Sequence, residues 1–169
     1  MQSSDEPAID EDGTTSAPSD AEITAFQVAT RDLIDIAVRG VELVTPDLTL
    51  PQFRLMLALA EYGPVSSVGL AHALDVAPSS VTRMVDRLVA SGHVDRAPDP
   101  AKRSVVSLAL SRRGSRAVAD VLRWRHSELS RVLGRIGPED RAAAARALTA
   151  LHRILDRNPE HSHLGWLPL

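Results

Sequence analysis

The stretch VSSVGLAHALDVAPSSVTRMVDRLVASGHVDRAPDPAKRSVVSLALSRRG, residues 65–114, decides the fold of this chain. Its apolar spacing and its breaks predict a short helix, a tight turn, a second helix rich in Ser, Thr and Arg, and two strands joined by a charged tip. The second helix presents Arg83 and Arg87 outward, and the tip carries Lys102 and Arg103. This layout suits one helix in a DNA major groove, with a wing that reaches the next stretch of backbone.

Local residues predict where the two helices begin and end. Ser66 is placed to cap the short helix, and residues 75–77 form the turn. Pro78 fits the first position of the next helix, where its missing N–H costs nothing, and Gly92 suits the left-handed residue that follows the helix. We therefore expect the second helix to span residues 78–91, with an inner stripe of Val81, Met84, Val85 and Leu88.

The two strands are expected at residues 93–97 and 104–110, because apolar and polar residues alternate along the second of them. Pro98, Asp99 and Pro100 lie between them. Since proline has no N–H to donate to a strand ladder, these three residues are expected in a loop.

Helices are expected on both sides of this stretch. Capping-box spacing predicts helix starts at Ser19 and Thr49, each followed three residues later by Glu or Gln. The first helix should cover about residues 19–45. The second, over about residues 53–60, is apolar nearly all round and should be buried. Two more helices should fill residues 111–157.

The expected organisation is one folded domain with a tail at each end. Residues 1–18 are polar and acidic with little to bury, so we expect them to be disordered. Residues 19–157 should fold as a mainly α domain with a small β-wing, and residues 48–110 should be its DNA-binding lobe. Residues 158–169 are expected to form a C-terminal tail.

The net charge of −3 hides an uneven distribution. Residues 1–20 carry six acidic side chains and no basic one. The remaining nineteen basic and sixteen acidic side chains give +3, and residues 66–125 alone hold ten basic against five acidic ones. Attraction to phosphate depends on such a local patch more than on the overall charge.

Several classes of function are disfavoured by what the sequence lacks. There is no cysteine, which excludes disulfides, thiolate metal sites and thiol redox sensing. Neither a glycine-rich phosphate loop nor a nucleophile elbow is present, so an enzyme is not expected. His161 and His163, near His152, form the one histidine cluster worth naming, and a surface tail is the better interpretation. We therefore expect no cofactor and no metal.

Hydropathy and the start of the chain disfavour a membrane or secreted location. No run of 18 apolar residues exists, and no basic-then-apolar stretch opens the chain. A cytoplasmic protein is expected.

At these residues the chain resembles the MarR family of winged helix-turn-helix regulators, named for multiple antibiotic resistance. The resemblance covers about residues 20–157. It rests on the order of several short pieces: Leu48-Thr49-x-x-Gln52, Leu70-Ala71, Ser80-Val81-Thr82-Arg83 with Leu88, Gly92-His93-Val94-x-Arg96, Asp99-Pro100, and Leu110-Ser111-x-x-Gly114.

The resemblance implies a homodimer whose interface is formed by the helices at about residues 19–45 and 111–157 of both chains. It also implies a recognition helix at about 78–91, a wing at about 96–107, and control by a small ligand or another signal. The family often has Asp-Pro-x-Asp-Arg-Arg at the wing tip. Here Lys102 replaces the second Asp and Ser104 the final Arg, so the usual wing salt bridge cannot form.

The candidate DNA contacts are Ser66, Pro78, Ser79, Ser80, Thr82, Arg83, Arg87, Lys102 and Arg103. The two helix arginines suit either guanine edges or phosphates. For Ser79 and Ser80, phosphate binding and simple helix initiation are equally good accounts. Asp86 either selects a cytosine amino group or braces Arg83 or Arg87, and we favour bracing. Trp124 and Trp166 either line an effector pocket or pack between helices, and packing is the commoner use.

The sequence therefore predicts a homodimeric transcriptional regulator, a repressor rather than an activator, that binds a pseudo-palindromic DNA operator. A phenolic or drug-like effector would bind between the dimer helices and the DNA-binding lobe. Two alternatives stay open: a winged-helix adaptor that binds another protein without DNA, and an enzyme that processes its ligand.

Overall fold

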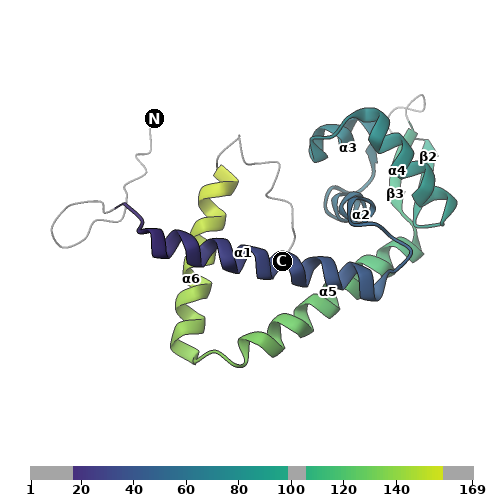
Figure 1. Cartoon of the computed structure of the whole chain (residues 1–169). Helices are drawn as coiled ribbons and strands as arrows, with labels where there is room; N and C mark the ends of the chain where they lie inside the picture. Colours follow the sequence, from purple (N-terminus) through teal and green to yellow (C-terminus); the bar gives the residue numbers. More distant parts are fainter. Residues whose placement is uncertain (1–16, 99–105, 158–169) are drawn as a thin grey trace. The chain divides into compact units, whose positions relative to one another are not determined.

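The computed structural model describes residues 17–98 and 106–157 of the chain. Along these residues the elements are α1 (Asp20–Val44), α2 (Leu50–Tyr62), β1 (Val65–Ser66), α3 (Ser67–Leu74), α4 (Pro78–Ala90), β2 (Val94–Pro98), β3 (Val106–Leu110), α5 (Arg112–Leu133) and α6 (Pro138–Arg157) (Figure 1). The chain divides into two compact units, residues 1–35 and 36–169, and the division falls within α1. Along the described stretches, no helix combines the length and the apolarity needed to cross a membrane.

The described part of the first unit is the beginning of α1. The capping box is present as predicted, because the Ser19 N–H donates to Glu22 Oε2 at 2.8 Å and the Glu22 N–H donates to Ser19 Oγ at 3.3 Å. These hydrogen bonds from Ser19 lower the pKa of the Glu22 carboxyl. The apolar side chains along this part of the helix are exposed: Ile23, Phe26, Val28, Leu33 and Ile34.

The second unit is built around α2, which is buried on nearly all sides as its composition predicts. Its capping box is also confirmed: the Thr49 N–H donates to Gln52 Oε1 at 2.9 Å, and the Gln52 N–H donates to Thr49 Oγ1. Gly63 follows the helix with φ of 70°, a conformation that glycine adopts without a steric penalty.

The helix-turn-helix consists of α3 and α4. Ser66 caps α3, as predicted, by accepting a hydrogen bond from the Gly69 N–H. The turn begins at Asp75, whose φ of 50° lies in the left-handed region that Asp tolerates better than most residues. Pro78 occupies the first turn of α4, and Gly92, with φ of 74°, follows its C-cap Ser91. These boundaries agree with the predicted ones to within one residue.

The strands form a three-stranded antiparallel sheet in the order β1-β3-β2. The sequence did not predict β1, in which Val65 lies opposite Leu108 and Ser66 opposite Ser107. Pro98 was predicted in the loop but ends β2, opposite Val106. Because β2 is an edge strand, a proline at its last position removes little pairing. Asp99 and Pro100, the rest of that predicted loop, lie outside the described residues.

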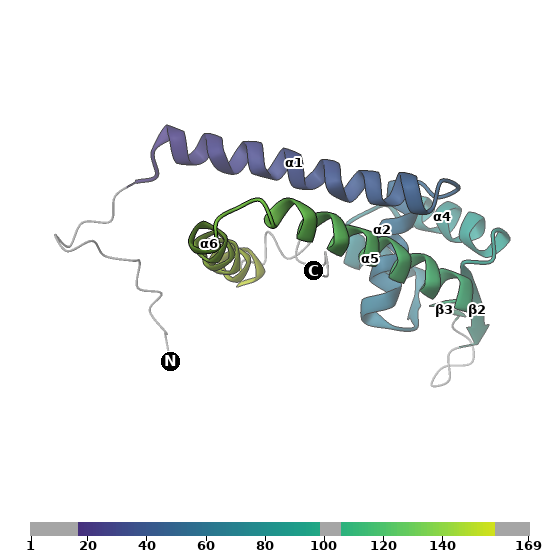
Figure 2. The same ribbon diagram turned by 90° about the horizontal axis from the view of Figure 1, so that it is seen from below.

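The first turn of α5 follows directly on β3 (Figure 2), and hydrogen bonds hold it against the residues that follow α4. Ser111 caps α5 and donates its hydroxyl hydrogen to the Gly92 carbonyl at 2.7 Å. The Ser111 N–H bonds to the His93 carbonyl at 3.0 Å. A Cβ on Gly114 would lie 2.1 Å from that same carbonyl oxygen, so only glycine fits there. The end of α4 and the start of α5 are thus joined by two hydrogen bonds from Ser111, one from its side chain and one from its backbone.

The core of the second unit is mainly aliphatic, in line with an aromatic content of only 3% in the sequence. Its largest fully buried side chains include Phe53, Leu55, Met56, Leu57, Leu70, Leu88 and Leu108. Trp124 of α5 packs against Gly40 of α1, where an added Cβ would meet the indole ring at 2.9 Å. Trp124 therefore serves helix packing, while Trp166 lies outside the described residues.

Candidate nucleic-acid interface

The two faces of α4 differ completely in exposure. Val81, Val85 and Leu88 are each 0% exposed, and Met84 is half-buried, so the predicted inner stripe is confirmed. On the opposite side Arg83 and Arg87 are exposed. Neither guanidinium has a hydrogen-bond or ion-pair partner among the described residues. The helix thus holds two solvated cations on a rigid, well-packed support.

The hydroxyl side chains in the first turn of α4 are exposed but differently engaged. Thr82 Oγ1 donates to the Pro78 carbonyl at 3.0 Å, so its proton is already used within the helix. Ser79 and Ser80 lie on the exposed start of the helix, and their hydroxyls have no partner among the described residues. The N-cap residue Ala77 has no side chain able to cap the helix. Exposed hydroxyls at an uncapped helix start suit an anion such as phosphate.

Ser66 and Pro78 have evident structural roles in addition to their predicted contact with DNA. Ser66 is half-buried and its Oγ accepts the Gly69 N–H at 3.1 Å, which leaves the hydroxyl proton free to donate. Pro78 is exposed at the first turn of α4. Both residues stay predictions as DNA contacts.

Asp86 braces neither Arg83 nor Arg87 in the structure, so the bracing prediction is wrong. Its carboxylate forms an ion pair with Arg96 of β2. Both side chains are partly exposed, at 56% for Asp86 and 42% for Arg96. The pair therefore links the outer face of α4 to the wing, and it leaves Arg83 and Arg87 free.

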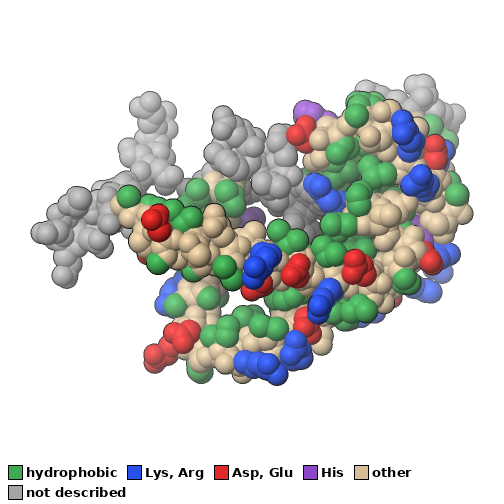
Figure 3. Space-filling model, in the orientation of Figure 1, with side chains coloured by type: hydrophobic (Ala, Val, Ile, Leu, Met, Phe, Trp, Pro, Cys, Tyr) green, Lys and Arg blue, Asp and Glu red, His purple; other side chains and the backbone are tan. Residues whose placement is uncertain are grey.

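The structure describes the base of the wing and not its tip. Lys102 and Arg103, the predicted contacts of the wing tip, lie outside the described residues. What is described is the base of the wing, β2 and β3 paired from Val94 opposite Leu110 to Pro98 opposite Val106. The space-filling view shows basic side chains over the region of α4 and the strands (Figure 3).

Two residues near α4 were not singled out as functional from the sequence. Arg96 was quoted only as part of a motif, and its pairing with Asp86 depends on how β2 packs against α4. His93 was likewise only a motif residue, yet it is 4% exposed between the end of α4 and the start of α5. Burial lowers the pKa of His93, Arg113 lowers it further, and Asp47 raises it in part. No sequence signal marks either role, because both depend on contacts across elements.

Metal binding finds no support in the described part of the chain. No group of three His, Asp or Glu side chains there could hold a metal ion. His152 is exposed, and His161 and His163 lie outside the described residues.

Helices α3 and α4 pack on a common core, and α4 presents its cationic face to solvent beside an antiparallel wing. Together these features define a winged helix-turn-helix protein. The family model described as "MarR family" matches residues 48–105. The crystal structure of RV1404 from Mycobacterium tuberculosis is 37% identical, with a TM-score of 0.76, and the match covers 83% of this chain and 97% of that one. The chain belongs to the MarR family of winged helix-turn-helix transcriptional regulators, which are DNA-binding proteins rather than enzymes.

Two further relatives are similar over most of their length. A MarR family protein from Bacillus stearothermophilus is 27% identical, with a TM-score of 0.71, over 83% of this chain and 100% of that one. The HTH-type transcriptional repressor MdtR of Bacillus subtilis is 28% identical over 115 residues, which are 68% of this chain and 74% of MdtR. The predicted fold class, mainly α with a small wing and long terminal helices, is confirmed.

Proposed function

We propose that this regulator is a ligand-responsive homodimeric repressor that inserts α4 into the DNA major groove. The observation that carries the proposal is the exposed, unpaired state of Arg83 and Arg87 on a helix whose opposite face is fully buried. A guanidinium that is free and rigidly supported can bond guanine O6 and N7 with both nitrogens, or hold a phosphate. Repression is suggested by the similarity to MdtR, which is named a repressor.

The wing would then lie beside the next minor groove. In this proposal Arg103 contacts the groove and Lys102 the backbone, while Ser66, Ser79 and Ser80 hold phosphates around α4. Thr82 would join them by turning its hydroxyl proton from the Pro78 carbonyl to a phosphate oxygen. A two-fold dimer would read two half-sites about one helical turn apart on a pseudo-palindrome.

Dimerisation is supported by the exposed apolar side chains of the terminal helices. In α6, Leu148 is 47% exposed, Leu151 37% and Ile154 64%. The first part of α1 exposes a further apolar set that includes Ile23, Phe26 and Leu33. Apolar side chains that gather on one helix in this way mark an interaction surface more often than a solvated one. We propose that helices at about residues 19–45 and 111–157 of two chains bury them together.

An effector site is supported by an apolar cavity of about 410 Å³ in the second unit. Leu59 of α2, Leu110 of β3, and Val118 and Leu122 of α5 form its apolar wall, and Ser115 adds a hydroxyl. Its volume suits a drug-sized or phenolic molecule, for which pockets of roughly 300–1,000 Å³ are usual. Because it joins the proposed dimer helix α5 to the DNA-binding lobe, a ligand there would alter the spacing of the two recognition helices.

Binding to DNA selected from the chain's own genome tests the proposal. We expect a gel shift on a pseudo-palindromic sequence, with an affinity that falls steeply as salt rises because Lys and Arg displace counterions from phosphates. If genomic selection yields no salt-sensitive shift, the repressor proposal fails and the protein-binding adaptor becomes the better account. The mass of the complex in multi-angle light scattering gives the number of protomers bound.

A further inference from the structure

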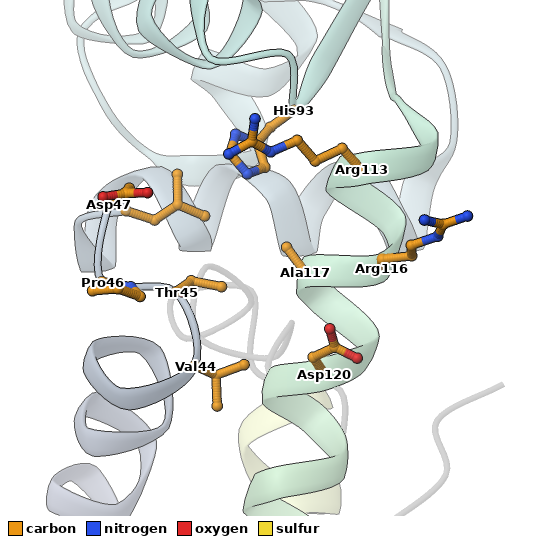
Figure 4. Close-up of a pocket in the computed structure, with 10 residues that line it drawn as sticks. Val44, Thr45, Pro46, Asp47, His93, Arg113, Arg116, Ala117 and Asp120 are labelled. Atoms are coloured by element: carbon orange, nitrogen blue, oxygen red, sulfur yellow. The ribbon is translucent and has the colours of Figure 1, made fainter.

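A second cavity, separate from the apolar one, lies in the second unit beside the end of α4. It has a volume of about 280 Å³. Its walls are the corner between α1 and α2 (residues 44–48), His93, and the first turns of α5 (Figure 4). The volume is below the usual range of drug-sized pockets, roughly 300–1,000 Å³, so the cavity suits a small metabolite.

His93 contributes a fixed hydrogen-bond acceptor to this cavity. Ser91 Oγ donates its proton to the Leu88 carbonyl at 3.2 Å, and the same oxygen lies 2.8 Å from His93 Nδ1. When the hydroxyl proton goes to the Leu88 carbonyl, Nδ1 is the donor to this oxygen, and the proton of the neutral ring sits on Nδ1. Nε2 then holds a lone pair and has no partner among the described residues. His93 as a whole is only 4% exposed, so packing holds the ring, and with it Nε2, in a fixed orientation.

The charged side chains around His93 are of both signs. Arg113 of α5 points toward the imidazole, whereas Arg116 points away from it (Figure 4). The Asp47 carboxylate lies on the opposite wall and acts electrostatically on the same ring. Arg113 and Asp47 form no ion pair with each other or with any other described residue. Asp120, lower on α5, is already paired with Arg123.

From this geometry we propose that the cavity binds a small zwitterion of the α-amino acid type. Its carboxylate would be held by the free guanidinium of Arg113, with which it can form two parallel hydrogen bonds. Its ammonium group would donate to the Asp47 carboxylate and to His93 Nε2. A simple organic anion fits less well, because both of the latter groups are acceptors that would face it without a proton to share.

The position of the cavity gives such a ligand a route to DNA binding, and this step rests on the proposed function. His93 follows α4 by three residues, and its carbonyl accepts the Ser111 N–H at the start of α5. A molecule that joins His93, Arg113 and the α1–α2 corner would therefore fix the position of the α4–α5 junction relative to that corner. Coupling of this kind is reciprocal: DNA and ligand change each other's affinity by the same factor.

Isothermal titration calorimetry of the full-length protein against the twenty protein amino acids tests the site. Each amino acid that binds is compared with its amide, which lacks the carboxylate, and its des-amino acid, which lacks the ammonium group. We expect both analogues to bind about tenfold or more weakly, since each loses a charge-assisted hydrogen bond. Arg113→Gln should weaken binding by a similar factor. Arg112→Gln, at a neighbouring exposed arginine that does not line the cavity, is the matched control and should bind normally.

Three results would overturn the zwitterion site: no amino acid binds, the des-amino acid binds as well as the amino acid, or Arg113→Gln binds as well as Arg112→Gln. The second result would identify a plain anion site instead. Circular dichroism of the variants shows whether they are folded, which is expected because Arg112 and Arg113 are both exposed. A gel shift of ligand-free protein separates the two proposals, because operator binding in the absence of amino acid does not depend on this cavity.

Discussion

Helices α4 and α6 are both amphipathic, but the chain buries only one of their apolar faces. Val81, Val85 and Leu88 of α4 are each 0% exposed, covered by the second unit's own core. Leu148, at 47%, and Ile154, at 64%, of α6 have no such cover. The comparison separates two uses of one sequence pattern. The apolar stripe of α4, buried by its own chain, holds the opposite face of that helix in position. The apolar stripe of α6, exposed in the single chain, favours contact with another protein surface.

Removing a side chain from the covered stripe should have the largest effect on stability. Leu88→Ala leaves a cavity in a packed core, and we expect the free energy of unfolding to fall by about 2–5 kcal/mol. Leu148→Ala on α6 is the matched control, because that side chain is half exposed in the single chain. Chemical denaturation at micromolar and lower protein concentrations measures both. Equal losses at the lowest concentration would mean that α6 is packed within one chain after all.

Polar substitution of the bare stripe should change the assembly and leave the fold intact. In the double variant Leu148→Ser and Ile154→Ser, the apolar area available to a second copy is lost, so we expect the proposed dimer to dissociate into folded monomers. Analytical ultracentrifugation measures the mass, and circular dichroism the helix content. Arg146→Ser, at an exposed residue of the same helix, serves as the control and should remain a dimer. A double variant that keeps the dimeric mass would remove α6 from the proposed interface.

The functional face of α4 should be sensitive in DNA binding and insensitive in stability. Arg83→Ala should weaken operator binding by about 1–3 kcal/mol and relax specificity at one base pair if the contact is to guanine. A loss that is uniform across sequences, with a shallower salt dependence, would show that Arg83 contacts only phosphate. Arg146→Ala on α6 is the control for general charge. If both variants lose the same affinity, α4 has no special place in recognition.

The parts of the fold that the sequence predicts are those with local chemical signals. Helix ends are marked by residues whose own backbone or side-chain chemistry favours a cap or a turn, and the helices begin and end beside them: the Thr49–Gln52 pair, Pro78, Gly92 and Ser111. Strand β1 escaped prediction because two residues have no periodicity. It exists only because β3 lies beside it.

In the candidate site, too, the sequence predicts the features that depend on local spacing and misses those that depend on contacts between elements. The exposure of Arg83 and Arg87 follows from helical spacing against the Val81 and Val85 side, so the sequence alone predicts it. The partner of Asp86 does not follow from spacing within the helix, because Arg96 reaches it from a different element. His93 likewise acquires its burial and its neighbours from packing among α1, α4 and α5. Contacts between elements are therefore what the sequence alone leaves open.

Acid should weaken the junction at the end of α4 through His93. Because burial lowers the pKa of this imidazole below its ordinary value of 6.5, the folded protein takes up a proton there less readily than the unfolded chain. The free energy of unfolding should therefore fall as the pH decreases below about 6.5. His93→Gln should lose this part of the pH dependence. Urea denaturation between about pH 7.5 and 5 measures it, a range above that in which Glu22 and Glu128 titrate, since their pKa values are lowered from 4.5. Parallel curves for the two proteins would contradict the assignment.

The smallest expected effect distinguishes the partners of Asp86. The ion pair with Arg96 joins two partly exposed side chains, and such pairs contribute about 0.2–1 kcal/mol. A double-mutant cycle of Asp86→Ala and Arg96→Ala should give a coupling energy in that range, and a control cycle of Asp86→Ala and Arg83→Ala should give none. Added salt should reduce the first coupling, because the charges are screened. If the control cycle couples instead, Asp86 pairs with Arg83 in solution. The carboxylate would then act within α4 and would not link that helix to the wing.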